Sequence, residues 1–165
     1  PKLIGEVFGI FKAYCTRVGS GPFPTELLGE SGDALRKQGN EFGATTGRPR
    51  RCGWLDIPAL KYAAMLNGVT QLFMMKVDIL SNLGDIMVCD SYAHQGKNTD
   101  EFTADFDDDW STNLKKFPSW SNHAFSKYDE FPEELRNYIF YIEGRTNVPI
   151  NLVSIGPERD RTIIK

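Results

Sequence analysis

The chain has 165 residues, of which 41% are hydrophobic and 25% charged, and its formal net charge is −3 at pH 7. These values are typical of a globular domain with its own core, and they argue against disorder. The negative charge excludes a general attraction for nucleic acid, and no apolar run approaches the roughly 20 residues that a membrane helix requires. The N-terminus lacks the regions of a signal peptide, so we expect a cytoplasmic protein without nucleic-acid or membrane partners.

Neither a repeat nor a flexible linker divides the sequence, which predicts a single unit over residues 1–165. Its three cysteines, Cys15, Cys52 and Cys89, are odd in number, widely spaced and without a partner at metal-ligand spacing. We therefore expect reduced thiols rather than disulfides or a metal centre.

The first half of the chain predicts strands and helices in alternation. Residues 5–18 are apolar and aromatic at a spacing that fits either element, and two glycines in this stretch favour a strand. A later helix has Asp56 as its cap, Pro58 in its first turn and Gly68 at its end. The predicted order is a strand at 5–18, a loop at 19–24, a helix at 31–38 that stops at Gly39, a helix between Asp56 and Gly68, and a continuous apolar strand at 69–75.

In the second half, residues 85–93 predict a strand, and the polar stretch 95–128 predicts mostly loop. Pro132 opens a helix that ends at Gly144 and whose apolar residues recur at helical spacing, and residues 148–154 predict another strand. Helices followed by buried strands indicate an α/β fold, which we expect to contain a mixed sheet with flanking helices.

One run, NEFGATTGRPRRCGWLD at residues 40–56, combines glycines, hydroxyls and three arginines. Glycines allow a close approach of the backbone to a ligand, and guanidinium groups bind phosphate and carboxylate oxygens in pairs. The run therefore predicts an anion-binding loop. Considered without other information, a nucleic-acid contact or a sorting signal explains the basic cluster comparably well, although the net charge argues against both.

A second motif, Lys76-Val77-Asp78, directly follows the apolar strand at 69–75. Open α/β sheets bind ligands at the carboxyl ends of their strands. An Asp carboxylate can accept hydrogen bonds from both N1–H and the exocyclic amine of guanine, whereas adenine offers neither donor there. The triplet alone is equally consistent with chance or a surface salt bridge, and Met75 stands where switch GTPases have an asparagine.

Three blocks together resemble the adenylosuccinate synthetase family: AYCTRVGSGPFPTE at 13–26, the run at 40–56, and SIGP at 154–157. The resemblance covers nearly the whole chain but only the C-terminal part of such an enzyme, because the Gly-rich phosphate loop that opens the family's sequence is missing. It implies a purine-biosynthesis ligase that condenses IMP with L-aspartate, using GTP, to form adenylosuccinate, GDP and phosphate on the route to AMP. It also implies a homodimer.

The resemblance assigns roles to individual residues. Arg48 corresponds to a contact to the IMP phosphate, Arg50 lies on the GTP side, and Val18 matches a segment of the IMP pocket, although a tight turn explains Val18 nearly as well. The implied aspartate and IMP contacts are Val18, Ala44, Thr45, Thr46, Gly47, Arg48, Pro49 and Arg50, and the implied GTP contacts are Arg50, Lys76, Val77, Asp78, Ser154, Ile155 and Gly156.

In the family, the catalytic base, the assisting histidine and the Mg²⁺ contacts belong to the N-terminal half, so we expect no catalytic residue and no metal ligand on this chain. We therefore expect the 165 residues to be inactive alone. Two alternatives remain: a stand-alone guanine-nucleotide-binding module without catalysis, and a protein-interaction domain without a ligand. A Gly-rich loop upstream in the natural gene product would favour the enzyme, and a native start at Pro1 would favour the module.

Other chemistry-bearing residues predict no site. Asp105, Asp107, Asp108 and Asp109 are typical of a solvated loop, and His94 and His123 lack partners for nucleophilic catalysis. We expect residues 43–50 to be mobile without an anion, because like-charged guanidinium groups repel one another.

Overall fold

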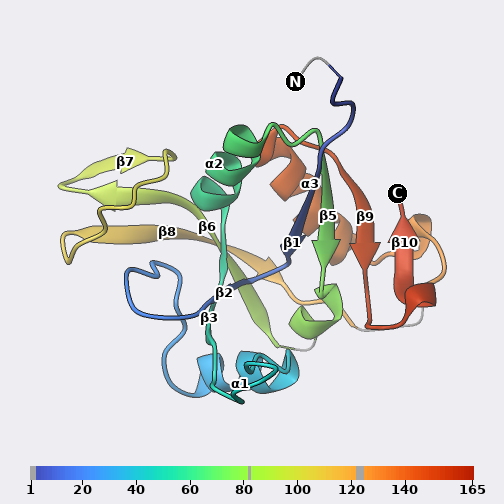
Figure 1. The fold of residues 1–165 in the computed structure, drawn as a ribbon, viewed down its shortest axis with the longest axis horizontal. Helices are drawn as coiled ribbons and strands as arrows, with labels where there is room; N and C mark the ends of the chain where they lie inside the picture. The colour runs from blue at the N-terminus through green and yellow to red at the C-terminus, as the bar shows by residue number, and fades with distance from the viewer. Residues whose placement is uncertain (1–2, 82, 122–124) are drawn as a thin grey trace.

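The computed structural model describes residues 3–81, 83–121 and 125–165, and it is an α/β structure as the sequence predicts. His123, for which we expected no catalytic role, lies outside the described residues. The central sheet consists of β1 (Phe8–Lys12), β5 (Gln71–Met75), β9 (Ile150–Ser154) and β10 (Thr162–Ile164), in this order. The first three strands are parallel and β10 is antiparallel, which confirms the expected mixed sheet (Figure 1).

The strand predicted at residues 5–18 is two strands. β1 joins the central sheet, whereas β2 (Cys15–Arg17) pairs antiparallel with β3 (Arg51–Gly53) in a separate ribbon. Ala13 and Tyr14, between the two strands, are both buried. The apolar pattern continues through this bend, which explains why the sequence alone predicts one strand.

Helix α2 (Ile57–Asn67) begins and ends where the sequence predicts. The Asp56 carboxylate accepts the backbone N–H of Ala59 at 3.0 Å, and Gly68 ends the helix in a left-handed conformation with φ 58°. Asp56 is also the last residue of β4 (Leu55–Asp56), and both of its carboxylate oxygens lie 2.8 Å from the buried hydroxyl of Tyr92. Helix α1 (Glu30–Gln38) stops at Gly39, also as predicted.

Helix α3 (Glu133–Thr146) packs its apolar face into the core but ends later than predicted. Leu135, Tyr138, Ile139 and Ile142 are fully buried. Gly144 lies inside the helix, and Asn147, in the left-handed conformation, ends it by donating its N–H to the carbonyl of Glu143. A glycine within a helix costs only about 1 kcal/mol relative to alanine, so the tertiary packing carries the helix past it.

The prediction of mostly loop over residues 95–128 misses two strands. β7 (Lys97–Thr99) and β8 (Trp110–Pro118) both pair antiparallel with β6 (Asp85–His94), which confirms the strand predicted at 85–93. β8 is mostly polar and exposed, so it lacks the hydrophobic alternation that marks a half-buried strand. Pairing with β6 stabilises it instead, and the three strands form an arm that extends away from the central sheet (Figure 1).

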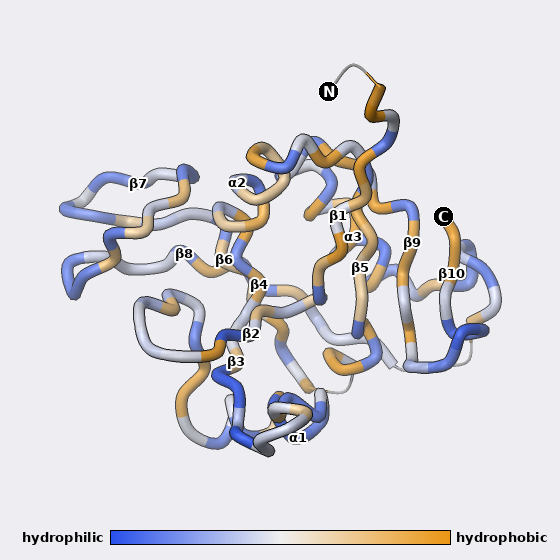
Figure 2. The backbone as a smooth tube through the Cα atoms, in the orientation of Figure 1, coloured by the Kyte–Doolittle hydropathy of each residue, from blue (hydrophilic) through white to orange (hydrophobic). Residues whose placement is uncertain are grey.

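The core lies between the central sheet and α3. Figure 2 shows hydrophobic residues along the central strands, whereas the turns of the arm are hydrophilic. The three cysteines are free, as predicted. Burial raises the pKa of the Cys15 thiol to about 12 and also raises that of Cys52. Within the described ranges, no helix is long and apolar enough to cross a bilayer.

Replacing Asp56 with alanine should lower the free energy of unfolding by about 2 kcal/mol, because it removes a helix cap and leaves the Tyr92 hydroxyl buried without its acceptor. Urea unfolding of the purified protein measures this difference. The matched control is Asp85→Ala, which removes an exposed carboxylate from a surface pair with Lys116 and should change stability by less than about 0.5 kcal/mol. Equal effects of the two substitutions would contradict the role of Asp56.

Candidate functional site

The carboxyl ends of β1, β5 and β9 lie at one edge of the central sheet, next to α1 (Figure 1). Lys12 is the last residue of β1 and pairs with Met75, the last residue of β5. The triplet at 76–78 follows β5, and Ile155 and Gly156 follow the neighbouring strand β9. The structure therefore brings the two sequence-predicted GTP segments to the same edge.

Asp78 lies in a short 3-10 helix (Val77–Leu80) and is half-buried. Burial raises the pKa of its carboxyl group, which its own N–H and the charges of Lys76 and Arg161 partly oppose. Among the described residues, no other residue donates a hydrogen bond to this carboxylate. Its oxygens therefore retain the capacity to accept two donors from a ligand.

Two of the predicted GTP contacts have their side chains in the core. Val77 and Ile155 are 1% and 2% exposed, so only their main-chain groups can meet a ligand. Ser154 is also buried, and its hydroxyl donates to the carbonyl oxygen of Gly156 at 2.9 Å. A side chain at Gly156 would place its Cβ 3.1 Å from the side chain of Arg161, so this tight turn favours glycine.

The sequence-predicted anion loop is closed at its base and exposed at its tip. The N–H of Gly43 donates to the carbonyl of Arg48 at 2.9 Å, and the N–H of Gly47 donates back to Gly43 at 2.8 Å. Gly47 has φ 65°, which favours glycine, and residues 44–49 are all exposed. Throughout the described ranges no carboxylate pairs with Arg48, so its guanidinium is available to an anion.

The three arginines of this run have different surroundings. Arg50 donates to Glu41 at 2.8 Å. Arg51 binds both oxygens of Glu26, at 2.8 and 2.5 Å, and donates to carbonyl groups of the turn at residues 19–21. Mutual repulsion of the arginines is therefore a weaker cause of motion than the sequence suggested, and mobility of residues 43–50 stays a prediction.

Val18 lies beside the arginine loop. Arg17 pairs with Arg51 across the β2–β3 ribbon, so the next positions outward along the two strands are Val18 and Arg50. The side chain of Val18 is 79% exposed. Two segments that are far apart in the sequence and carry implied IMP contacts thus come together.

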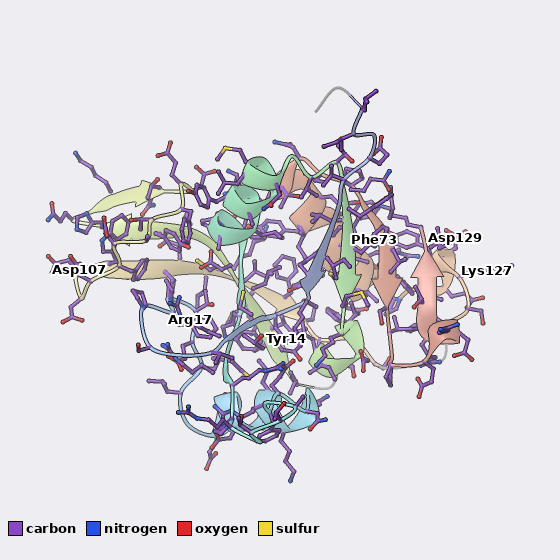
Figure 3. All side chains as sticks on the ribbon, viewed as in Figure 1. Tyr14, Arg17, Phe73, Asp107, Lys127 and Asp129 are labelled. Carbon is purple, nitrogen blue, oxygen red and sulfur yellow. The ribbon has the colours of Figure 1, made fainter. Side chains whose placement is uncertain are left out.

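Glu41, which the sequence did not single out, is the electrostatic centre of this edge. Its side chain is fully buried and contacts the buried Tyr14, which Figure 3 labels between the central sheet and α1. It accepts hydrogen bonds from the side chains of Tyr14 at 2.6 Å, Lys12 at 2.9 Å, Lys76 at 2.8 Å and Arg50 at 2.8 Å. Burial alone would raise the pKa of Glu41, but these donors lower it to about 2.

The carboxylates at this edge do not fit a Mg²⁺ site. Both oxygens of Glu41 are occupied by cationic donors, and Asp78 lies within the electrostatic reach of Lys76 and Arg161. Mg²⁺ needs several oxygen ligands that are not already neutralised by cations. The expectation that Mg²⁺ ligands lie outside this chain stays a prediction.

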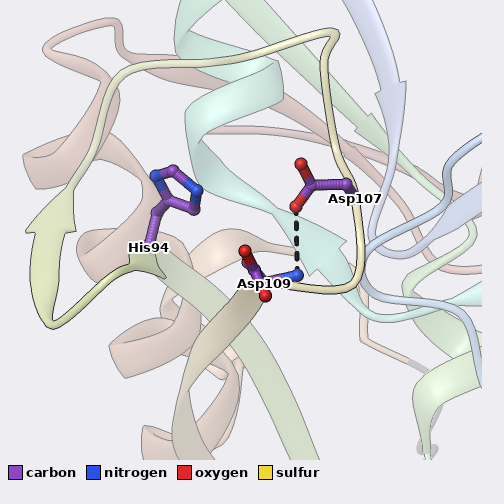
Figure 4. A group of neighbouring side chains, drawn as sticks. All are labelled: His94, Asp107 and Asp109. Atoms are coloured by element: carbon purple, nitrogen blue, oxygen red, sulfur yellow. Dashed lines mark hydrogen bonds between the residues drawn. The ribbon is translucent and has the colours of Figure 1, made fainter.

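A separate group of potential metal ligands lies at the arm (Figure 4). One ligand atom from each of His94, Asp107 and Asp109 lies within 4.8 Å of the others. Asp107 accepts the N–H of Asp109 at 3.0 Å, and the ring of His94 stacks on Trp110 at 4.3 Å. These contacts account for the arrangement without an ion, and both carboxylates are exposed. The expectation that no site lies here stays untested.

A pocket of about 660 Å³ lies elsewhere, between α2 and the segment around Phe102. None of the sequence-predicted site residues lines it. Its polar lining includes Lys61 and Asp100, which pair with each other at 2.5 Å and so offer little to a ligand. The sheet edge therefore remains the candidate site.

Comparisons with known proteins agree on one family. A family model described as adenylosuccinate synthetase matches residues 1–163. The chain is 50% identical to an adenylosuccinate synthetase of Parabacteroides distasonis over 167 residues, covering 100% of this chain and 40% of that protein. It is 52% identical to one of Cytophaga hutchinsonii over 169 residues, covering 100% of this chain and 39% of that protein.

A solved structure is also similar. It is the fully ligated adenylosuccinate synthetase of Plasmodium falciparum, which superposes with a TM-score of 0.90 at 36% identity and covers 99% of this chain and 41% of that one. The chain thus spans about 40% of the length of the curated relatives it matches.

Replacing Glu41 with glutamine should make the free energy of unfolding depend less on pH in the acidic range. The pKa of Glu41 in the fold, about 2, lies below its ordinary value of 4.5, so its ionised form stabilises the fold fully above about pH 4.5 and loses that effect as pH falls toward 2. The contribution at neutral pH is on the order of 3 kcal/mol. Urea unfolding of the full-length protein that carries this chain, between pH 7 and 3, should show a shallower pH dependence in the variant.

The matched control is Glu26→Gln, which also removes a carboxylate that pairs with an arginine but lies near the surface. Its effect on the pH dependence should be smaller. A pH dependence of Glu41→Gln that equals that of the unsubstituted protein would contradict the assignment.

Proposed function

The chain belongs to the adenylosuccinate synthetase family, and we propose that it is the C-terminal, guanine-reading and substrate-positioning part of a ligase that joins L-aspartate to IMP. GTP is the co-substrate, and adenylosuccinate, GDP and phosphate are the products, in AMP biosynthesis. Family membership over residues 1–163 supports this proposal. We further propose that the complete enzyme is a cytoplasmic homodimer, as the family resemblance implies.

The observation that supports the proposal is the contact between the 3-10 helix that carries Asp78 and β9, which leads into the turn at residues 154–156, with no other described residue donating to the Asp78 carboxylate. Guanine presents two adjacent N–H donors to such a carboxylate. Adenine would leave the carboxylate half-buried without a partner, which costs more than a lost apolar contact. Asp78 therefore selects GTP over ATP.

Lys76 contributes through its aliphatic stem. Its ammonium group is held by Glu41 and by the carbonyl of Gly39, both at 2.8 Å. The stem between this anchor and the backbone can pack along the base plane. The turn of Ser154, Ile155 and Gly156 supplies main-chain groups on the other side of the base.

The exposed loop positions the other substrates. Arg48 binds the IMP phosphate, because a planar guanidinium group matches phosphate oxygens in pairs, and Val18 lines the same pocket. Ala44, Thr45, Thr46 and Gly47 surround the aspartate carboxylates, and Pro49 fixes the spacing between Arg48 and Arg50. Arg50, which is partly buried, lies between the two nucleotides.

In the proposed reaction, the γ-phosphoryl group of GTP is transferred to the 6-oxygen of IMP. The aspartate amine then attacks C6 of IMP, and the oxygen leaves with the phosphate. Mg²⁺ supplies neutralisation of the phosphate charge when bound. The catalytic base, the assisting histidine and the Mg²⁺ ligands are proposed to come from the part of the enzyme that this chain does not span. The residues of this chain bind and orient the substrates.

The 165-residue chain should form no adenylosuccinate from IMP, aspartate and GTP, since it lacks the phosphate loop and the catalytic base of the family. Chromatographic detection of the product, with the full-length protein as the positive control, tests this. Measurable turnover by the chain alone would contradict it.

Asp78→Asn in the full-length protein should weaken GDP binding at least about tenfold and leave ADP binding nearly unchanged. The reason is that one acceptor oxygen is replaced by an amide NH2 group, a donor that faces the donors of guanine. Calorimetric titration with GDP and ADP measures both affinities. Asp85→Asn, at an exposed position on β6, is the matched control. Equal affinities for GDP and ADP in the unsubstituted protein would overturn guanine recognition, and GDP binding without ligation would favour a non-catalytic binding module.

A further inference from the structure

We propose that Glu41 is a positioning residue that couples the aspartate and IMP loop to the guanine site, so that occupancy of either site strengthens binding at the other. The inference rests on the proposed function and extends it to regulation of the same site. The juxtaposition that carries it is a single buried carboxylate bound to both Arg50 and Lys76.

The contacts divide the two oxygens of Glu41 between the sites. Oε1 accepts from Nζ of Lys76 at 2.8 Å, and Oε2 accepts from Nη1 of Arg50 at 2.8 Å. Lys12 lies 2.9 Å from both oxygens, and the Tyr14 hydroxyl lies 2.6 Å from Oε1. Each cation therefore shares its carboxylate with the others, and a change at one alters the attraction felt by the rest.

Arg50 is held to Glu41 through its main chain as well. Its N–H donates to the carbonyl of Glu41 at 2.9 Å, and its own carbonyl accepts from Nε of Arg36 at 2.7 Å. The end of the anion loop is thus fastened to the residue that carries the carboxylate. Movement of the loop toward an anion pulls directly on the Arg50–Glu41 pair.

At the guanine site, Lys76 has φ 62°, a left-handed conformation that is uncommon for a residue with a side chain. Such a conformation persists where the surroundings fix it, and the bonds from its ammonium group to Glu41 and Gly39 are among those restraints, with the bond from the N–H of Ile79 to its carbonyl. The orientation of Lys76, and of the triplet that it opens, therefore depends on Glu41.

The charges favour coupling of positive sign. One carboxylate faces Lys12, Arg50 and Lys76, which leaves an excess of two positive charges, and these cations are 27–35% exposed to solvent. An anionic ligand that draws Arg50 away leaves Lys12 as the remaining donor to Oε2, and the attraction of Glu41 for Lys76 then increases. The guanine site becomes better ordered when the other site is filled, and by linkage the converse also holds.

The test measures the affinity of the full-length protein for GDP by calorimetry, without and with saturating IMP and L-aspartate. GDP cannot donate a γ-phosphoryl group, so no turnover occurs. We expect IMP and aspartate to tighten GDP binding, and Glu41→Gln to reduce that tightening about fivefold or more. Glu26→Gln, which removes a carboxylate paired with Arg51, is the matched control. It should preserve the ratio of the GDP affinity with IMP and aspartate to the GDP affinity without them.

A merely structural role would lower the melting temperature and weaken GDP binding equally with and without IMP and aspartate, and that result would overturn the proposal. If Glu41→Gln does not fold, Tyr14→Phe removes one hydrogen bond to Glu41 while keeping every charge, and it should reduce the ratio by a smaller factor. A ratio of one in the unsubstituted protein would refute coupling while leaving guanine recognition intact. Loss of the preference for GDP over ADP would instead refute the proposed function.

Discussion

The structure depends on one buried negative charge. A carboxylate taken out of water is strongly unfavourable unless cations and hydrogen bonds replace its hydration, and Glu41 receives both from Lys12, Arg50, Lys76 and Tyr14. These partners come from the end of β1, the end of the anion loop and the residue after β5. The charge balance of one side chain therefore fixes the relative positions of three segments that are distant in the sequence.

The parallel arrangement of β1, β5 and β9 determines what can meet at this edge. Parallel strands present all their carboxyl ends on the same side, where the chain must turn and side chains are free of the sheet ladder. The same geometry brings Asp78 toward the turn after β9 and Lys12 toward Lys76. The proposed base recognition and the charge balance of Glu41 thus share one sheet edge, and a perturbation of one reaches the other through direct contacts.

The sequence predicted the features that depend on local chemistry. The cap at Asp56 and the stop at Gly68 act within one turn of α2, and the apolar spacing on α3 identifies its buried face, so short patterns sufficed. The sequence did not predict β8 because this strand is stabilised by pairing with β6, and its own mostly polar residues show no strand pattern. The end of α3 was misplaced because Asn147, rather than the more usual glycine, adopts the left-handed conformation there.

For the candidate site, the sequence indicated the ligand-facing residues but not the residues that hold them. Asp78 and Arg48 belong to recognisable motifs, and the structure leaves both without a carboxylate or side-chain donor partner among the described residues. Glu41 belongs to the arginine-containing run at residues 40–56, yet nothing in its neighbours predicts burial or contacts with residues 29 and 35 positions away. Arg51, the third arginine of the motif, was assigned no ligand contact, and its pairing with Glu26 gives it a structural role.

The charge distribution also limits what this part of the enzyme can do. At the sheet edge the carboxylate of Glu41 is saturated by cations, so the local field is positive and favours phosphate and carboxylate groups. The same field repels a divalent cation, which the proposed phosphoryl transfer requires. The proposed ligase would therefore take its metal-binding carboxylates from a different segment of the protein, and this chain spans about 40% of the length of its curated relatives. A metal ion at this edge would compete with Arg50 and Lys76 for the two oxygens of Glu41.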